Sequence, residues 1–274
     1  MALRLGLALC GEGIAAAAHV GVLRALAERS VAPGALCGAG GGALAAALAA
    51  LDGEPMQSAA LSAALAGRHA LGGEAARGRA LSRALLALTE GAPMRACKTP
   101  LALPCVAALS GKGLAFTSAP GLRALSEPAG SGLVFTREAP LWLGVRAAMS
   151  APAWVTPASW MDVPLIAAQE PEACALALRA LGAQELLFVV PVYQPDGRPD
   201  AFTRCALCHA RRFARIEGAC VLTPAMPRGM GALSARRATE CEQAGYDCAV
   251  EALDGLLTAW GVSGGRILPF RPRR

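Results

Sequence analysis

The sequence contains few aromatic residues and almost no lysine. Aromatic residues make up 4% of the 274 positions, and all of the 26 basic residues except Lys98 and Lys112 are arginine. Sites for nucleic acids usually combine basic side chains with aromatic rings on which bases stack, so we expect no nucleic-acid partner. Charged residues are also scarce, at 17% against 54% hydrophobic residues. That balance excludes an intrinsically disordered chain and indicates a folded domain with a sizeable core.

No segment has the features of a signal peptide or a membrane span. The apolar start, Met1 to Cys10, gives way to Gly11-Glu12-Gly13 after too short a run for a signal sequence. The uncharged stretch 31–51 contains several glycines, which argue against a membrane helix. The ten cysteines are scattered, and without a secretory signal they favour reduced thiols over a disulfide framework. We therefore expect a cytoplasmic protein, either free or peripheral to the membrane.

Positive charge is concentrated in the last third of the chain. The net charge is +6, and residues 198–274 contain twelve arginines against seven acidic residues. Such a segment fits an anionic membrane surface or an acidic partner. The alternative is a set of solvated arginines on amphipathic helices, and the sequence leaves both open.

The order of hydrophobic patterns predicts an α/β fold. Alternating leucines in 3–9 predict a buried strand, and helical spacing follows in 14–28. A strand at 35–39 and a helix at 43–51 repeat this order, which favours a three-layer α/β/α fold with a mainly parallel sheet. Further strands are expected at 101–107, 113–117, 132–136, 185–192 and 219–223, and further helices over 53–95 with glycine breaks, near 139–149, and at 170–182, 204–216 and 232–260.

The chain shows no clean domain boundary. We expect residues 1–192 to form the α/β domain and residues 193–274 to pack on it as a C-terminal extension, in one structural domain overall.

Each of the first two predicted strands ends in a glycine-rich turn. The first, 10–16, fits the loose dinucleotide-binding pattern G-x-G-x-x-A, but no acid follows the second strand to hold a ribose. The second turn, Gly38-Ala39-Gly40-Gly41-Gly42, has the spacing of the nucleophile elbow G-x-S-x-G, with Gly40 at the serine position. Taken alone, this turn is a glycine-rich helix start that indicates no catalysis.

Taken together, the two turns resemble motifs of the patatin-like phospholipase family. In that family a glycine loop of the form G-G-G-x-R/K-G precedes A-A-H-x-G-V-L, and G-x-S-x-G follows. Residues 11–23 and 38–42 lie in that frame without a gap. Segments 111–118, 145–152 and 177–190 resemble three later motifs of the family, so the similarity covers residues 3–192.

The resemblance implies a serine–aspartate dyad, one half of which is missing. The nucleophile position of the elbow, between Gly38 and Gly42, is Gly40. The base position is Asp162, which is followed by Val163-Pro164 where the family has glycines. A glycine has no atom that can form an acyl-enzyme.

The loop that would hold the oxyanion also departs from the family pattern. It corresponds to Gly11, Glu12, Gly13 and Ala15, in which Glu12 replaces a glycine and Ala15 replaces a basic residue. A carboxylate at this point would oppose the negative charge of an oxyanion. We therefore predict a pseudoenzyme with the fold of a lipid-metabolism hydrolase, which binds a lipid, an acyl ligand or a protein partner.

Two alternatives stay open. An active acyl hydrolase would need another nucleophile, for which Cys10, Cys37 and Ser150 are the nearest candidates. The segment Cys205-Ala206-Leu207-Cys208-His209 matches the haem-attachment pattern C-x-x-C-H and also offers zinc ligands. Ordinary helical cysteines are the favoured explanation of this segment, and we expect no cofactor and no metal.

Overall fold

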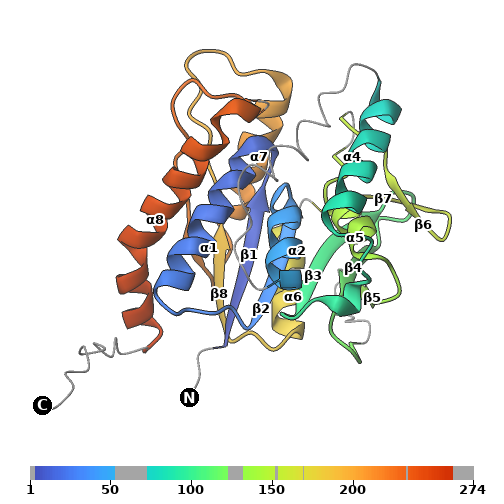
Figure 1. The fold of residues 1–274 in the computed structure, drawn as a ribbon, viewed down its shortest axis with the longest axis horizontal. Coiled ribbons are helices and arrows are strands. Elements are labelled where there is room, and N and C mark those ends of the chain that lie inside the picture. The colour runs from blue at the N-terminus through green and yellow to red at the C-terminus, as the bar shows by residue number, and fades with distance from the viewer. Residues whose placement is uncertain are drawn as a thin grey trace, which may run out of the picture.

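The computed structural model describes residues 4–52, 73–122, 132–151, 154–168, 170–232 and 234–261. These residues form a nine-stranded sheet with helices on both faces (Figure 1). The strands are β1 (Leu5–Gly11), β2 (Ala35–Gly40), β3 (Leu101–Ala107), β4 (Gly113–Thr117), β5 (Leu133–Thr136), β6 (Ala158–Trp160), β7 (Val163–Ala167), β8 (Glu185–Val189) and β9 (Cys220–Leu222). The α-helices are α1 (Ala18–Glu28), α2 (Gly42–Asp52), α4 (Glu74–Leu88), α5 (Leu141–Ala148), α6 (Pro171–Ala180), α7 (Ala201–Phe213) and α8 (Ala238–Ala259), and 3₁₀ helices span Gly13–Ala17 (η1), Met94–Ala96 (η3) and Ala235–Arg237 (η4).

The sheet is mixed but mostly parallel, in the order β5-β4-β3-β2-β1-β8-β9. β1 pairs in parallel with both β2 and β8, so the centre of the sheet has the predicted direction. β4 and β7 run antiparallel to β3. β2 pairs with β3 only at Leu101 and Ala102, and β7 takes over that edge of β3 from Cys105 to Ala107.

Alternation of side chains along β1 creates the two faces of the core. Leu5, Leu7 and Leu9 point into the larger hydrophobic cluster, which α1, α2, α5 and α8 cover. Ala8 and Cys10 point into a second cluster that contains residues of α6 and α7. Side chains of a strand point to opposite faces in turn, so this seven-residue strand is buried throughout. The three-layer α/β/α architecture is therefore confirmed.

The C-terminal part of the chain contributes to both the sheet and its cover. β9 extends the sheet by pairing in parallel with β8, and α8 packs along α1 (Figure 1). The boundary expected at residue 192 stays a prediction.

The structure departs from the predicted elements in three places. Gly78 lies inside α4 and does not break it, while residues 53–72 of the predicted helical stretch lie outside the described residues. The hairpin of β6 and β7 falls in a segment for which no strand is predicted. α7 begins at Ala201, inside the predicted loop 194–203, because the Asp200 carboxylate caps it by accepting from the Thr203 N–H at 2.9 Å.

Among the described helices, none combines the length and the hydropathy needed to cross a bilayer.

Candidate functional site

The two glycine turns lie side by side at the carboxyl edge of the sheet. The parallel register of β1 and β2 places Gly11 opposite Gly40, the last residue of each strand. Because parallel strands end at the same edge, the loops that follow them meet there, as ligand sites of open α/β sheets do. The sequence predicts both turns correctly, and their contact follows from the register.

Gly40 occupies a sharp strand-to-helix corner. It ends β2 with a φ of +60°, a left-handed conformation that favours glycine, and α2 begins two residues later. The glycines on either side allow close packing, since a Cβ on Gly38 would approach the Ala43 nitrogen to 3.0 Å and one on Gly42 would approach the Leu9 carbonyl carbon to 2.5 Å. A sharp strand-to-helix turn is also the setting of a nucleophile elbow, in which a serine occupies the corner.

The side chain of Glu12 fills the space beside this corner. A Cβ built on Gly40 would lie 2.7 Å from the Glu12 Cδ and closer still to its Oε1. It would also lie 2.6 Å from the Gly11 carbonyl oxygen. The carboxylate thus stands where the side chain of a serine would have to begin. Glu12 is buried, with 5% of its surface exposed, so its side chain cannot easily turn out into solvent.

His209 approaches the same carboxylate from α7. Its Nδ1 lies 3.5 Å from Glu12 Oε1, and its side chain is almost completely buried. The ring also packs against Phe213, with the centroids 4.2 Å apart. From the sequence, His209 is expected only as a metal or haem ligand. Its place in a helical stripe with Phe202, Ala206 and Phe213 indicates an inward direction.

The side chains of the C-x-x-C-H segment differ in their exposure. Cys205 and Cys208 are exposed on α7, whereas His209 faces the interior and Glu12. Among the described residues, no group of three His, Cys, Asp or Glu side chains has the arrangement of a metal site. The geometry therefore does not favour the zinc or haem alternative.

Hydrogen bonds within the protein occupy three of the backbone donors around the corner. The Gly41 N–H, which follows the nucleophile position, donates to the Gly11 carbonyl at 2.6 Å. In the first turn the Ile14 N–H donates to the Ala232 carbonyl, and the Ala15 N–H donates to the Tyr193 hydroxyl, both at 2.9 Å. An oxyanion hole requires such donors to point at the substrate. These three already have partners.

Tyr193 closes the first turn, and no sequence motif singles it out. Its hydroxyl accepts from the Ala15 N–H and donates to the Glu12 carbonyl, at 2.9 Å in each case. It follows β8, the other strand beside β1. The strand predicted at 185–192 already places Tyr193 just beyond a strand end. Ala15 itself is 1% exposed, which leaves no room for the basic side chain of the family pattern.

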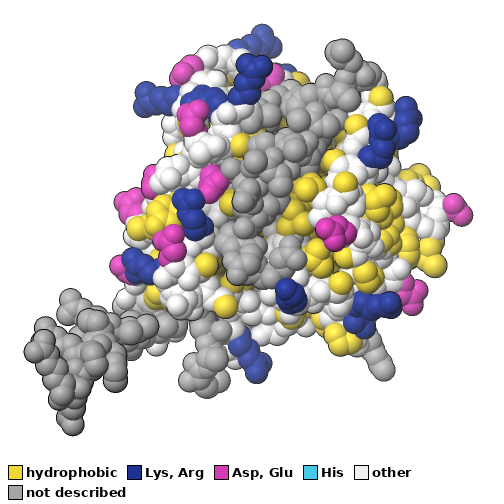
Figure 2. Space-filling model, in the orientation of Figure 1, with side chains coloured by type: hydrophobic (Ala, Val, Ile, Leu, Met, Phe, Trp, Pro, Cys, Tyr) yellow, Lys and Arg dark blue, Asp and Glu magenta, His cyan; other side chains and the backbone are white. Residues whose placement is uncertain are grey.

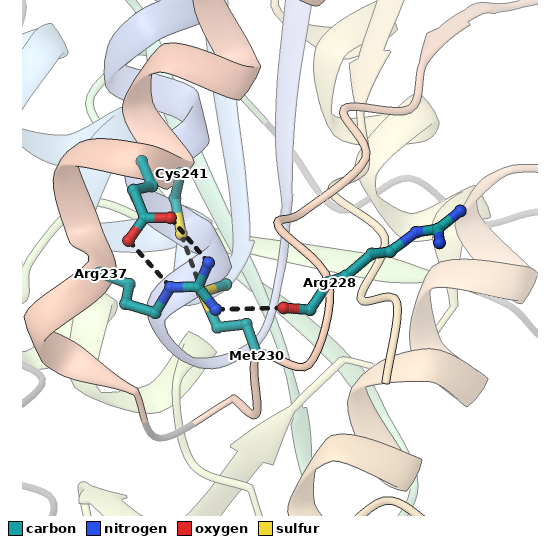
Figure 3. A network of polar contacts seen from close by, with 5 residues as sticks. Arg228, Met230, Arg237 and Cys241 are labelled. Carbon is teal, nitrogen blue, oxygen red and sulfur yellow. Dashed lines mark hydrogen bonds and ion pairs between the residues drawn. The ribbon is translucent and has the colours of Figure 1, made fainter. Parts of the chain in front are cut away.

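A loop between β9 and α8 covers the first turn. The Ala232 carbonyl accepts from Ile14, and the Ala232 N–H donates to the Thr203 hydroxyl at 2.9 Å. Further along, Arg237 binds the Glu240 carboxylate and donates to the Arg228 carbonyl at 3.2 Å (Figure 3). The Cys241 thiol contacts the Met230 sulfur at 3.6 Å. These contacts fasten the loop to α7 and to the start of α8.

Asp162 lies on the exposed turn of the β6–β7 hairpin. Met161 and Asp162 form a two-residue turn with φ values of 48° and 61°, between the paired residues Trp160 and Val163. Two left-handed residues in succession characterise the tight turns of hairpins. Among the described contacts, none joins the exposed Asp162 to the buried Gly40. Its assignment as a base stays a prediction.

The other candidate nucleophiles are buried or engaged. The Ser150 hydroxyl accepts from Arg146 Nη1 at 2.5 Å and from the Ala158 N–H at 3.1 Å, and it donates to the Arg146 carbonyl at 2.8 Å. Burial raises the pKa of the Cys10 and Cys37 thiols, which favours the unreactive protonated form. None of the three side chains is arranged as an activated nucleophile.

Comparison with solved structures supports the fold. The chain resembles the crystal structure of VipD from Legionella pneumophila, a patatin-like phospholipase, with a TM-score of 0.51 at 9% identity. The match covers 93% of this chain and 67% of VipD. No family model matches the chain, and no curated protein matches its sequence. The chain thus has an α/β fold, with a mostly parallel central sheet, that is similar to the patatin domain of VipD.

Proposed function

We propose that this chain is a patatin-like domain that does not hydrolyse esters and acts by binding. One observation carries the proposal: the Glu12 carboxylate occupies the space in which a side chain on Gly40 would start. The substitutions at positions 12 and 40 therefore fit each other, because the larger residue fills the room that the smaller one leaves. Loss of a serine nucleophile costs about 10⁶ in rate in a comparable triad.

The surroundings of the corner support the same conclusion. The N–H groups of Ile14, Ala15 and Gly41 are used within the protein, and the loop at Ala232 lies over the first turn. A buried carboxylate next to this turn would repel the charge of a tetrahedral intermediate. The candidate ligands are a lipid, an acyl group or a protein partner.

The Arg-rich C-terminal third is a second candidate contact with anionic membranes. Two of its arginines are paired within the protein, Arg212 with Glu170 and Arg237 with Glu240. Others, such as Arg204 and Arg211, are exposed on α7. These two provide the charge variants with which a membrane contact can be tested.

The proposal is tested with a fluorophosphonate probe and short-chain nitrophenyl esters. We expect no labelling and no turnover above that of the heat-unfolded protein, since a glycine cannot be acylated. The esters also report nucleophiles other than serine, and an active serine esterase serves as the positive control. Stoichiometric labelling at any residue, or turnover that survives repurification, would overturn the proposal.

A further inference from the structure

A basic cavity of about 570 Å³ lies between α4, α5 and the first strand of the β6–β7 hairpin. α4 contributes Arg79, Ser82 and Arg83, and α5 contributes Trp142 and Arg146. The segment that leads into β6 and β6 itself form the remaining wall, which includes Ser159. Among the described residues that line it, three are arginines and none is acidic. The cavity shares no residue with the Gly40 corner.

Arg79 and Arg83 lie where both can bind one anion. They lie one turn apart on the exposed side of α4, and no described acidic side chain forms an ion pair with either. Like charges four residues apart on a helix repel each other and destabilise the helix. A bound anion would remove this repulsion. Their guanidinium groups can also bind two oxygen atoms of one phosphate at once, which an ammonium group cannot do with the same geometry.

Arg146 supplies a third positive charge at the inner wall. It is 3% exposed, and its two terminal nitrogens donate to the Ser150 hydroxyl and the Thr156 carbonyl, each at 2.5 Å. Gly78 makes room for it, because a Cβ on Gly78 would lie 2.9 Å from Arg146 Nη2. The side chain is therefore fixed. A charge held in a poorly hydrated wall acts on the cavity with less screening than a surface charge.

We propose that this cavity binds the phosphate group of a ligand. Arg79 and Arg83 make the charge-assisted contacts, Arg146 adds to the positive potential, and the Ser159 hydroxyl and the Trp142 ring complete the wall. The absence of acidic residues among the described lining favours an anion over a cation. The inference is independent of the proposed loss of hydrolysis, since a phosphate site at α4 can exist whether or not the corner is active.

The phosphate group belongs either to a soluble monoester or to the headgroup of a lipid. The hairpin that carries Ser159 also carries Met161 at its tip, with 76% of its surface exposed. Hydrophobic side chains gather on the surface over α4 and α5, with Lys and Arg side chains at the margin (Figure 2). An exposed apolar tip beside a phosphate site suits a membrane surface, so the two sources are distinguished by experiment.

The first measurement is a calorimetric titration of the whole chain with inorganic phosphate at near-physiological salt. We expect saturable binding, and at least about tenfold weaker binding in the Arg79→Gln/Arg83→Gln variant, because this variant loses the charge-assisted hydrogen bonds of two guanidinium groups. The Arg204→Gln/Arg211→Gln variant removes the same charge from α7 and should bind as the native protein does. Absence of saturable binding, or equal weakening in both variants, would overturn the proposal.

Flotation with vesicles identifies the source of the phosphate. Vesicles containing phosphatidic acid are compared with vesicles of phosphatidylcholine alone. If a lipid headgroup is the ligand, Met161→Ser weakens flotation with phosphatidic acid but leaves the titration with inorganic phosphate unchanged. If only soluble phosphate binds, flotation is absent and the titration result stands. A third outcome refutes the α4 site and favours the C-terminal arginines. In this outcome inorganic phosphate shows no saturable binding, and flotation is lost in the Arg204→Gln/Arg211→Gln variant but kept in the Arg79→Gln/Arg83→Gln variant.

Discussion

Glu12 and Gly40 are best understood as one feature of the molecule. Each departs from the family pattern at its own place in the sequence, but the register of β1 and β2 brings them into contact. A serine at position 40 and a glutamate at position 12 would compete for the same volume. The glycine at position 40 and the carboxylate at position 12 are therefore physically linked, and changing one alone does not make room for a serine at this corner.

This linkage predicts the result of Gly40→Ser. We expect the variant to be less stable by about 1–3 kcal/mol, because the new Cβ meets Glu12 and the backbone has a left-handed φ of +60°. No ester turnover should appear. Urea denaturation of Gly40→Ser, Glu12→Ala and the double variant measures the coupling between the two sites. The double variant should lose less free energy of unfolding than the two single variants lose together. Some loss remains, because the new Cβ at position 40 still lies close to the Gly11 carbonyl oxygen. Strict additivity would contradict the contact between positions 12 and 40.

The cysteines should differ in reactivity according to burial. Burial raises the pKa of Cys10 and Cys37, and Cys174 of α6 is buried in the same hydrophobic cluster. Cys205 and Cys208 are exposed. Alkylation of the native protein followed by mass spectrometry should modify Cys205 and Cys208 first and reach the buried trio only in denaturant. Rapid modification of Cys10 in the native state would show that the core around β1 opens.

At the scale of elements, the contact between α1 and α8 depends on two glycines. A Cβ on Gly21 would lie 2.6 Å from the Tyr246 nitrogen, and one on Gly245 would lie 2.7 Å from the Ala18 carbonyl carbon. The helix backbones therefore approach closely. Around this contact Arg24 pairs with Glu242 at 2.6 Å and lies 4.5 Å from the centre of the Tyr246 ring.

Two substitutions on α8 separate this packing from helix propensity. Gly245→Ala should destabilise the protein by about 1–3 kcal/mol, because the added methyl group forces the helices apart. Gly255→Ala is the matched control, since nothing lies within 4 Å of its added Cβ, and it should be neutral or stabilising by up to about 1 kcal/mol. Both values come from chemical denaturation. An equal effect of the two changes would mean that α8 does not rest on α1 through Gly245.

Sequence patterns predict most elements and both turns, but not the contacts between distant segments. β1, β2 and β3 follow from short apolar runs, and α8 follows from a long helical pattern. The β6–β7 hairpin was missed because its strands are short, Pro164 lies in one of them, and its turn uses Met161 and Asp162 where hairpins usually have glycine or asparagine. Glu12 was recognised as a departure, but its contacts with Gly40 and His209 join three elements and require the tertiary structure.

For the molecule as a whole, the site and the core are not separate regions. β1, η1 and α1 carry the first glycine turn and also supply buried residues to the larger hydrophobic cluster. β9 and α8 are added from the C-terminal part, and the loop between them seals the same turn. A charge that is introduced near this turn therefore affects the stability of the entire fold. Protonation of His19, a buried residue of α1, provides such a charge.

His19 lies in α1 beneath the first turn and is fully buried, with no described hydrogen-bond partner for either ring nitrogen. Burial lowers its pKa to about 3, whereas in the unfolded chain an imidazole takes up its proton near about pH 6.5. Between these values the unfolded state binds more protons, so the free energy of unfolding should fall as the pH drops from about 6.5 towards 3. The contribution of one group is about 1.4 kcal/mol per pH unit, and it ends below the folded pKa.

Urea denaturation across this range should give a shallower fall in the free energy of unfolding for His19→Leu than for the native protein. The slope is compared, and not the absolute stability, because the substitution also changes packing. An unchanged slope would mean that His19 can be protonated in the folded state, and with it that the glycine turn above it is open to water.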